Sequence, residues 1–183
     1  MKLTRRLFVT ALAAAATAPA AGAHTMFNQW VVYRQKHLLI GCHRKDMTTY
    51  ELALQLSETL AHLLPEASSR PARAPHPQRL ASLLGTRQLE LAVLAKGTAS
   101  DIKTASGPFS PYGLVPLQQL AIVDEHVLVA HRDFTPHHAW LLASALDQSG
   151  LDLTSPDGED SLDLHRGVAA YIDGVPMSKL LPG

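Results

Sequence analysis

The chain has 183 residues, 46% of them hydrophobic and 17% charged, so it can bury a core in one domain or two small ones. Sixteen basic side chains balance sixteen acidic ones, and the absence of a positive field argues against binding to nucleic acid or to an anionic membrane surface. A single cysteine excludes an intramolecular disulfide and every zinc site with two thiolates, so any metal would depend on the ten histidines.

The first 23 residues have the features of an export signal. Lys2, Arg5 and Arg6 form a basic start, residues 7–18 are apolar and rich in alanine, and small residues precede a cleavage point after Ala23. The arginine pair resembles the twin-arginine signal, which addresses a folded protein for export. The alternative is an ordinary secretory signal, and both predict a periplasmic protein.

Cleavage after Ala23 leaves residues 24–183 as the mature domain. Removing the three basic residues of the signal leaves thirteen basic against sixteen acidic side chains, a formal charge of −3. We expect one α/β domain, with residues 151–183 as a less ordered tail.

The clearest structural signal is a strand followed by a helix. Residues 38–41 form a short apolar run that ends at a glycine, which is typical of a buried strand. Thr48 and Glu51 have capping-box spacing and predict the start of the helix, and Pro65 predicts its end. The apolar face of this helix consists of Leu52, Leu56, Leu60 and Leu63.

The next segments repeat this alternation. Residues 68–74 predict a second strand, Pro77 and Gly85 bound a second helix, and residues 89–94 predict a third strand. Three strands joined by two helices favour right-handed crossovers, and therefore a parallel sheet with helices on both faces. The predicted fold is a three-layer α/β sandwich.

The second half is less regular. Residues 95–116 are rich in Gly, Ser, Thr and Pro, which predicts a long loop, and residues 117–123 and 127–131 predict two further strands. A helix is expected from Thr135–Pro136 until Gly150. Residues 152–163 then suggest a solvated loop, followed by one or two helical turns around Val168 and Tyr171.

Several local phrases resemble the TAXI group of substrate-binding proteins, the periplasmic receptors of certain TRAP transporters. The phrases are Ile40-Gly41 before the helix that contains residues 50–53, then residues 77–93, 128–134 and 164–171. The resemblance implies the type II periplasmic-binding-protein fold and a role in transport. Such receptors close two lobes on a ligand, whereas the mature chain has room for one lobe and a C-terminal return segment. A homodimer is one way to rebuild a cleft.

The loop after the first strand is the main candidate binding site. It lies at a helix N-terminus, where amide groups and the helix dipole favour an anion, and Arg44 and Lys45 add positive charge. The candidate ligand-binding residues of this loop are Cys42, His43, Arg44, Asp46, Thr48 and Thr49. In the resembled family this loop is built from small residues, so the family's ligand does not transfer to this chain.

Lys96 and Thr98 complete the predicted site. They follow the third strand, and the carboxyl ends of parallel strands meet at one edge of a sheet. We therefore expect a small anionic solute between the two loops. The competing interpretation is that Arg44, Lys45 and Lys96 are solvated charges around a vestigial site.

Cys42 supports two interpretations of its own. A thiol beside His43 and near a helix start could be a nucleophile with a lowered pKa, but a free cysteine is more often a small buried residue, and no nucleophile motif accompanies it. The favoured prediction is therefore a protein that is not an enzyme and that binds a small anionic solute or acts as an accessory component of a transport system.

Copper is the alternative ligand. Cleavage after Ala23 would make His24 the N-terminal residue, whose amine and imidazole can chelate copper, with Cys42 and His43 as further candidate ligands. The alternative function is thus delivery of copper to an exported oxidoreductase. The competing interpretation is that the histidines are scattered over the surface.

Overall fold

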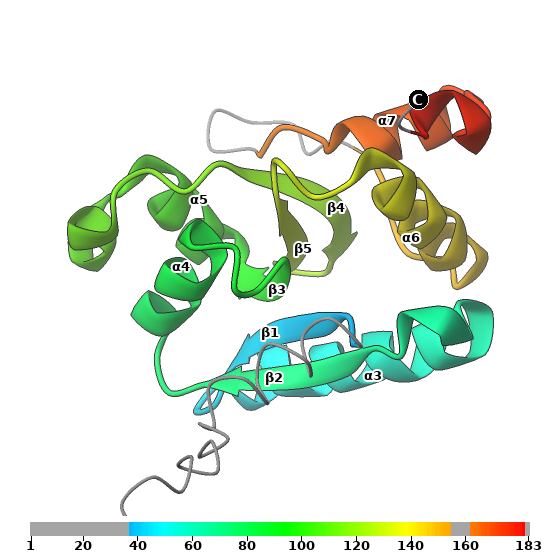
Figure 1. Ribbon diagram of the computed structural model, residues 1–183. Helices are drawn as coiled ribbons and strands as arrows, with labels where there is room; N and C mark the ends of the chain where they lie inside the picture. Colours follow the sequence, from blue (N-terminus) through cyan, green and yellow to red (C-terminus); the bar gives the residue numbers. More distant parts are fainter. Residues whose placement is uncertain (1–36, 155–161, 182–183) are drawn as a thin grey trace, which may run out of the picture. The chain divides into compact units, whose positions relative to one another are not determined.

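A mixed five-stranded sheet forms the centre of the fold (Figure 1). The computed structural model describes residues 37–154 and 162–181. The strands follow the order β2-β1-β3-β5-β4, in which β1 is parallel to β2 and β3. β5 is antiparallel to both of its neighbours. The strands are β1 (Leu39–His43), β2 (Arg70–Ala74), β3 (Leu91–Ala95), β4 (Leu117–Val123) and β5 (His126–His131).

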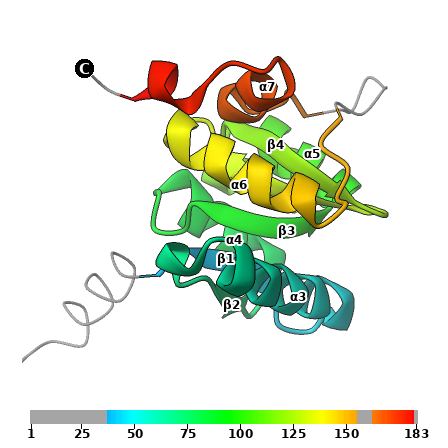
Figure 2. The same cartoon turned by 90° about the vertical axis from the view of Figure 1, so that its right-hand side faces the viewer.

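Helices cover both faces of this sheet (Figure 2). One face packs against α3 (Met47–Leu63), α6 (Pro136–Gln148) and α7 (Arg166–Ile172). The other face packs against α4 (Pro77–Gly85) and α5 (Lys96–Thr104). This confirms the predicted single-lobe, three-layer α/β sandwich. The parallel pairing holds for the first three strands, and the β4–β5 hairpin adds the antiparallel part.

Strand β1 is apolar and buried from Leu39 to Cys42 because helices cover both of its faces. Ile40 and Cys42 belong to the core on the α3 side, and Leu39 belongs to the core on the α4 side. A Cβ at Gly41 would meet the side chains of Leu80 and Leu89. The glycine therefore permits the close approach of α4 to the sheet.

The predicted start of α3 is wrong by two residues. The helix begins at Met47, and the carboxylate of Asp46 accepts hydrogen bonds from the backbone N–H groups of Thr48 (3.1 Å) and Thr49 (3.3 Å). Asp46 is therefore the N-cap, and Thr48 lies inside the first turn instead of capping it. The predicted end holds, because α3 stops at Leu63 and Pro65 begins a short 3-10 helix, η1 (Pro65–Ala67).

The predicted loop over residues 95–116 is also wrong. It contains α5 and a second 3-10 helix, η2 (Gly107–Tyr112). Ala99 and Ile102 of α5 and Phe109 of η2 are buried in the core on the α4 side. Burial of these apolar side chains outweighs the low helix propensity of the neighbouring Gly, Ser and Thr.

The C-terminal segment returns to α6. The predicted helical turns around Val168 and Tyr171 are α7, and Met177–Leu180 form the 3-10 helix η3. The indole N–H of Trp140 donates to the carbonyl of Val175 (2.9 Å), and the Trp140 and Tyr171 rings meet edge to face. The hydroxyl of Tyr171 donates to the carboxylate of Asp147 (2.8 Å).

Candidate functional site

The carboxyl ends of β1 and β3 lie at one edge of the sheet, as expected, because the two strands are parallel neighbours. We call this the carboxyl edge. α3 begins there after β1, and α5 begins there directly after β3. Residues 42–49 and the pair Lys96 and Thr98 therefore meet at the same edge, although Lys96 and Thr98 belong to a helix and not to a loop.

The loop before α3 satisfies its own hydrogen-bonding groups. In addition to the Asp46 cap, the hydroxyl of Thr49 donates to the carbonyl of Asp46 (3.1 Å) and accepts from the N–H of His43 (3.2 Å). The carboxylate of Asp46 thus occupies the position that an anionic ligand would take at this helix N-terminus.

The basic side chains at this edge point into solvent. Arg44, Lys45 and Lys96 are exposed, and Thr98 is half-buried. The positive charge of Lys96 also lies near the carboxylate of Asp152, whose pKa is lowered chiefly by hydrogen bonds from Thr154 and to a smaller extent by Lys96. Opposite charges therefore stand close together at this edge.

Cys42 lies in the core on the α3 side and is fully buried. Its Sγ donates to the carbonyl of Ala72 (3.6 Å). Burial raises the pKa of the thiol to about 11, although Arg73 lowers it, so the thiol is protonated at neutral pH. Because neighbouring residues on a strand face opposite sides, the side chains of Cys42 and His43 diverge.

Metal ligands do not gather in the described part of the chain. Within residues 37–154 and 162–181, no group of three or more His, Cys, Asp or Glu side chains could hold a metal ion. His24, the export signal and the cleavage point lie outside these residues. In the same ranges, no helix is sufficiently long and apolar to span a membrane.

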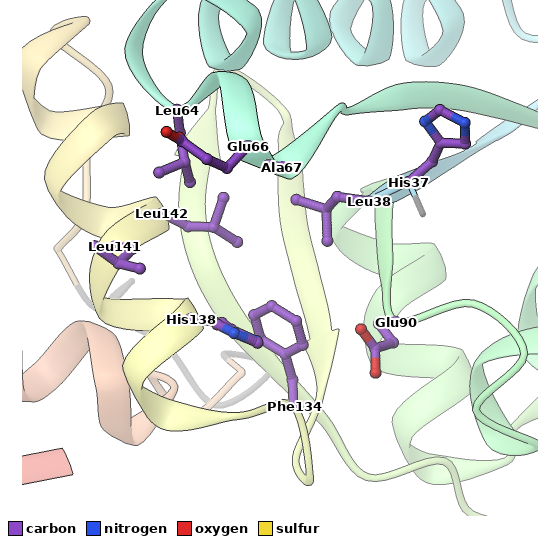
Figure 3. Close-up of a pocket in the computed structure, with 10 residues that line it drawn as sticks. All are labelled: His37, Leu38, Leu64, Glu66, Ala67, Glu90, Phe134, His138, Leu141 and Leu142. Carbon is purple, nitrogen blue, oxygen red and sulfur yellow. The ribbon is translucent and has the colours of Figure 1, made fainter. Parts of the chain in front are cut away.

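A pocket lies at the opposite edge of the sheet, which we call the amino edge (Figure 3). It has a volume of about 330 Å³. The N–H of Leu38 donates to the carbonyl of Ala67 (2.9 Å), and the N–H of His131 donates to the carbonyl of Glu90 (3.1 Å), which brings the surrounding segments together. The lining residues are His37, Leu38, Leu64, Glu66, Ala67, Glu90, Phe134, His138, Leu141 and Leu142.

The pocket combines an apolar wall with a few polar groups. Leu38 and Leu142 point toward the Phe134 ring, His138 lies against that ring, and Glu90 lies on the other side of the hollow (Figure 3). Glu90 is exposed at the pocket mouth, yet desolvation of its carboxylate raises its pKa, against the opposing charge of Arg87. Desolvation lowers the pKa of His138, and so does the neighbouring His137.

A second hollow adjoins this pocket and shares Glu90 and Phe134 with it. It is lined by Thr86, Arg87, Glu90, His131, Asp133 and Phe134. The guanidinium of Arg87 pairs with the carboxylate of Asp133 at 3.5 Å, and both side chains are exposed. Arg87 therefore has a carboxylate partner other than Glu90.

Buried histidines fix the position of Phe134. The carbonyl of Phe134 accepts a hydrogen bond from Nε2 of His165 (3.0 Å), and its N–H donates to the carbonyl of His131 (2.8 Å). Nδ1 of His131 accepts from the N–H of Asp133 (3.1 Å). The position of this pocket wall thus depends on two residues, His131 and His165, that do not line the pocket themselves.

Sequence reasoning missed this pocket. The available signal was Glu90, a carboxylate set between Leu89 and Leu91 at the start of a buried strand. The other lining residues come from segments far apart in the chain, and no spacing rule links them.

Comparisons with protein-family models, curated proteins and solved structures found no match. Any functional conclusion for this chain therefore comes from its own residues.

Proposed function

We propose that this chain is an exported, non-enzymatic binding protein that holds a small solute in the pocket at the amino edge. The observation that carries the proposal is the pocket itself. A concave, mainly apolar site with a few polar groups is typical of small-molecule binding, and about 330 Å³ suits a small organic molecule. The periplasmic location rests on the export signal, and the single α/β lobe is compatible with the resemblance to TAXI-type receptors.

The placement of Cys42 favours binding over catalysis. It was the candidate nucleophile, and its thiol is buried and protonated at neutral pH. The polar groups of the pocket stand beside leucine and phenylalanine side chains that would shelter a solute from water (Figure 3).

Native mass spectrometry of the full chain, purified from a periplasm, tests the proposal. We expect a noncovalent mass excess that Ala67→Phe abolishes, because Ala67 lines the pocket and the larger ring would fill it. Ala61→Phe is the matched control, since Ala61 is exposed on α3 and does not line the pocket. A bare mass, or an excess that persists in Ala67→Phe, would contradict this assignment.

A second candidate function is the binding of a small anion at the carboxyl edge. It is supported by the parallel pairing of β1 with β3, which brings Arg44 and Lys96 to one edge. Succinate is a suitable probe for calorimetry. We expect Arg44→Ala and Lys96→Ala each to weaken its binding about tenfold, whereas Arg70→Ala, at the opposite end of β2, leaves it unchanged. Equal affinities in all three variants would sink this candidate.

A further inference from the structure

The charged groups around the pocket point to the chemistry of its ligand. Among the residues that the structure describes, two carboxylates, Glu66 and Glu90, line the pocket, and neither an arginine nor a lysine does. His138 is held in its neutral form at pH 7, because its surroundings lower its pKa. Among the described residues that line the pocket, the carboxylates therefore outnumber the basic groups that are always charged.

The adjacent hollow does not reverse this balance. Its one basic side chain that is always charged, Arg87, is paired with Asp133. His131 lies in the same hollow, and burial lowers its pKa, so it adds no positive charge at neutral pH. Glu90 consequently faces the pocket as a carboxylate whose charge is only partly compensated by Arg87.

We propose that this pocket binds a small amphipathic amine, with the ammonium group against the carboxylate of Glu90 and the apolar tail between Leu38, Leu142 and Phe134. This inference rests on the proposed function, since it names the class of solute. A cation supplies the charge partner that a partly desolvated carboxylate needs.

The raised pKa of Glu90 agrees with this assignment. Desolvation of the carboxylate causes the shift, and an ammonium group would offset the cost of that desolvation. A neutral or anionic head group would leave the cost in place.

A matched set of three ligands tests the head group. Hexylamine, hexan-1-ol and hexanoate share one apolar tail, and calorimetry on the full chain measures the affinity of each. We expect hexylamine to bind at least about tenfold more tightly than hexan-1-ol, and hexanoate to bind most weakly. Glu90→Gln should reduce hexylamine to the affinity of hexan-1-ol and leave hexan-1-ol unchanged. Glu58→Gln, an exposed change on α3, should alter neither.

The outcomes separate this inference from the proposed function. If all three ligands bind equally and Ala67→Phe blocks them, the pocket is a binding site but the amine assignment is wrong. If the preference for hexylamine survives Glu90→Gln, the role of Glu90 is wrong. If none of the three ligands binds, the amine assignment is wrong. The proposed function is then tested separately by native mass spectrometry of the protein purified from a periplasm.

Discussion

Asp46 determines both the start of α3 and the character of the carboxyl edge. Its carboxylate accepts from two N–H groups of the first turn and carries a negative charge at the positive end of the helix dipole. A residue that caps a helix in this way also competes with any external anion for the same donors. The cap is thus a structural reason to look for the ligand elsewhere.

Replacement of the cap should destabilise the protein. Asp46→Ala leaves the N–H groups of Thr48 and Thr49 without their acceptor, and we expect a loss of about 1 kcal/mol in the free energy of unfolding. Thr48→Ala is the control, because its exposed side chain does not cap the helix, and it should change stability by less than about 0.5 kcal/mol. Urea unfolding measures both values. A larger loss of stability for Thr48→Ala than for Asp46→Ala would show that Thr48 caps the helix, as the sequence predicted.

His165 is a polar residue in the core: its side chain is completely buried, and both of its ring nitrogens form hydrogen bonds. Nδ1 accepts from the N–H of Gly167 (3.2 Å), so the ring proton resides on Nε2, which donates to the carbonyl of Phe134. Burial lowers the pKa of this histidine, although the bond to Phe134 opposes the shift. A second proton on the ring would have to bind Nδ1, where it would point at the N–H of Gly167 and replace the hydrogen bond between them.

Acid should therefore weaken the fold through His165. The unfolded histidine binds a proton near its ordinary pKa of 6.5, whereas the folded one does so only at lower pH. Its contribution to stability is complete above pH 6.5 and declines as the pH falls below that value. We expect the difference in unfolding free energy between pH 7.5 and pH 5.5 to be smaller in His165→Gln than in the wild type.

His62→Gln is the control for this comparison, since His62 is exposed in the last turn of α3. It should retain the wild-type pH dependence. If the free energy of unfolding falls by the same amount between pH 7.5 and pH 5.5 in His165→Gln and in the wild type, groups other than His165 cause the acid sensitivity.

At the scale of elements, α6 and α7 approach each other closely at Gly167. A Cβ on Gly167 would meet the backbone carbonyl oxygen of Pro136 and would lie 2.8 Å from the Cβ of Ala139. Only glycine allows this approach, and a backbone atom cannot rotate away as a side chain can. The position of α7 therefore depends on one missing methyl group.

Gly167→Ala should force the two helices apart. We expect it to reduce the free energy of unfolding by more than about 2 kcal/mol, as overpacking against a backbone does. Gly97→Ala in α5 is the matched control, because a Cβ there has no neighbour within 4 Å, and it should be neutral or stabilising by up to about 1 kcal/mol. Thermal unfolding of both variants distinguishes them. Equal melting temperatures would show that α7 can shift without cost.

The elements that could be predicted were those with strong local patterns. The apolar run of β3, the Pro77 and Gly85 boundaries of α4 and the Pro136 start of α6 are examples. α5 was missed because its burial depends on β3 and β5, which the local sequence does not reveal.

The candidate sites also differ in how far the sequence predicts them. The meeting of residues 42–49 with Lys96 follows from the topology of parallel strands and was predictable. The pocket was not, because it depends on contacts between the start of β1, the end of α3 and the first turns of α6. These contacts exist only after the chain has folded.

At the scale of the whole molecule, the predicted export signal bears on where the proposed binding site would operate. The paired Arg5 and Arg6 predict the twin-arginine route, which requires a protein that is folded before it crosses the membrane. The single cysteine is buried and free, so folding does not require an intramolecular disulfide. The chain can therefore fold in the reducing cytoplasm.

Substitution of both arginines tests this route. Arg5→Lys combined with Arg6→Lys keeps the positive charge of the signal but removes the arginine pair, and we expect the protein to remain in the cytoplasm with its signal attached. Cell fractionation and sequencing of the mature N-terminus measure the result, and His24 should be the first residue of the exported wild type. Undiminished export of the double variant would instead favour the ordinary secretory route.

The pocket joins segments about a hundred residues apart in the chain, since His37 and Leu38 precede β1 whereas Leu141 and Leu142 lie in α6. A solute held there would link the two segments. Local opening of either segment would then require its release, so the bound population would resist proteolysis of the opened form. Occupancy would therefore slow the degradation of the protein, and an empty copy would be cleaved first.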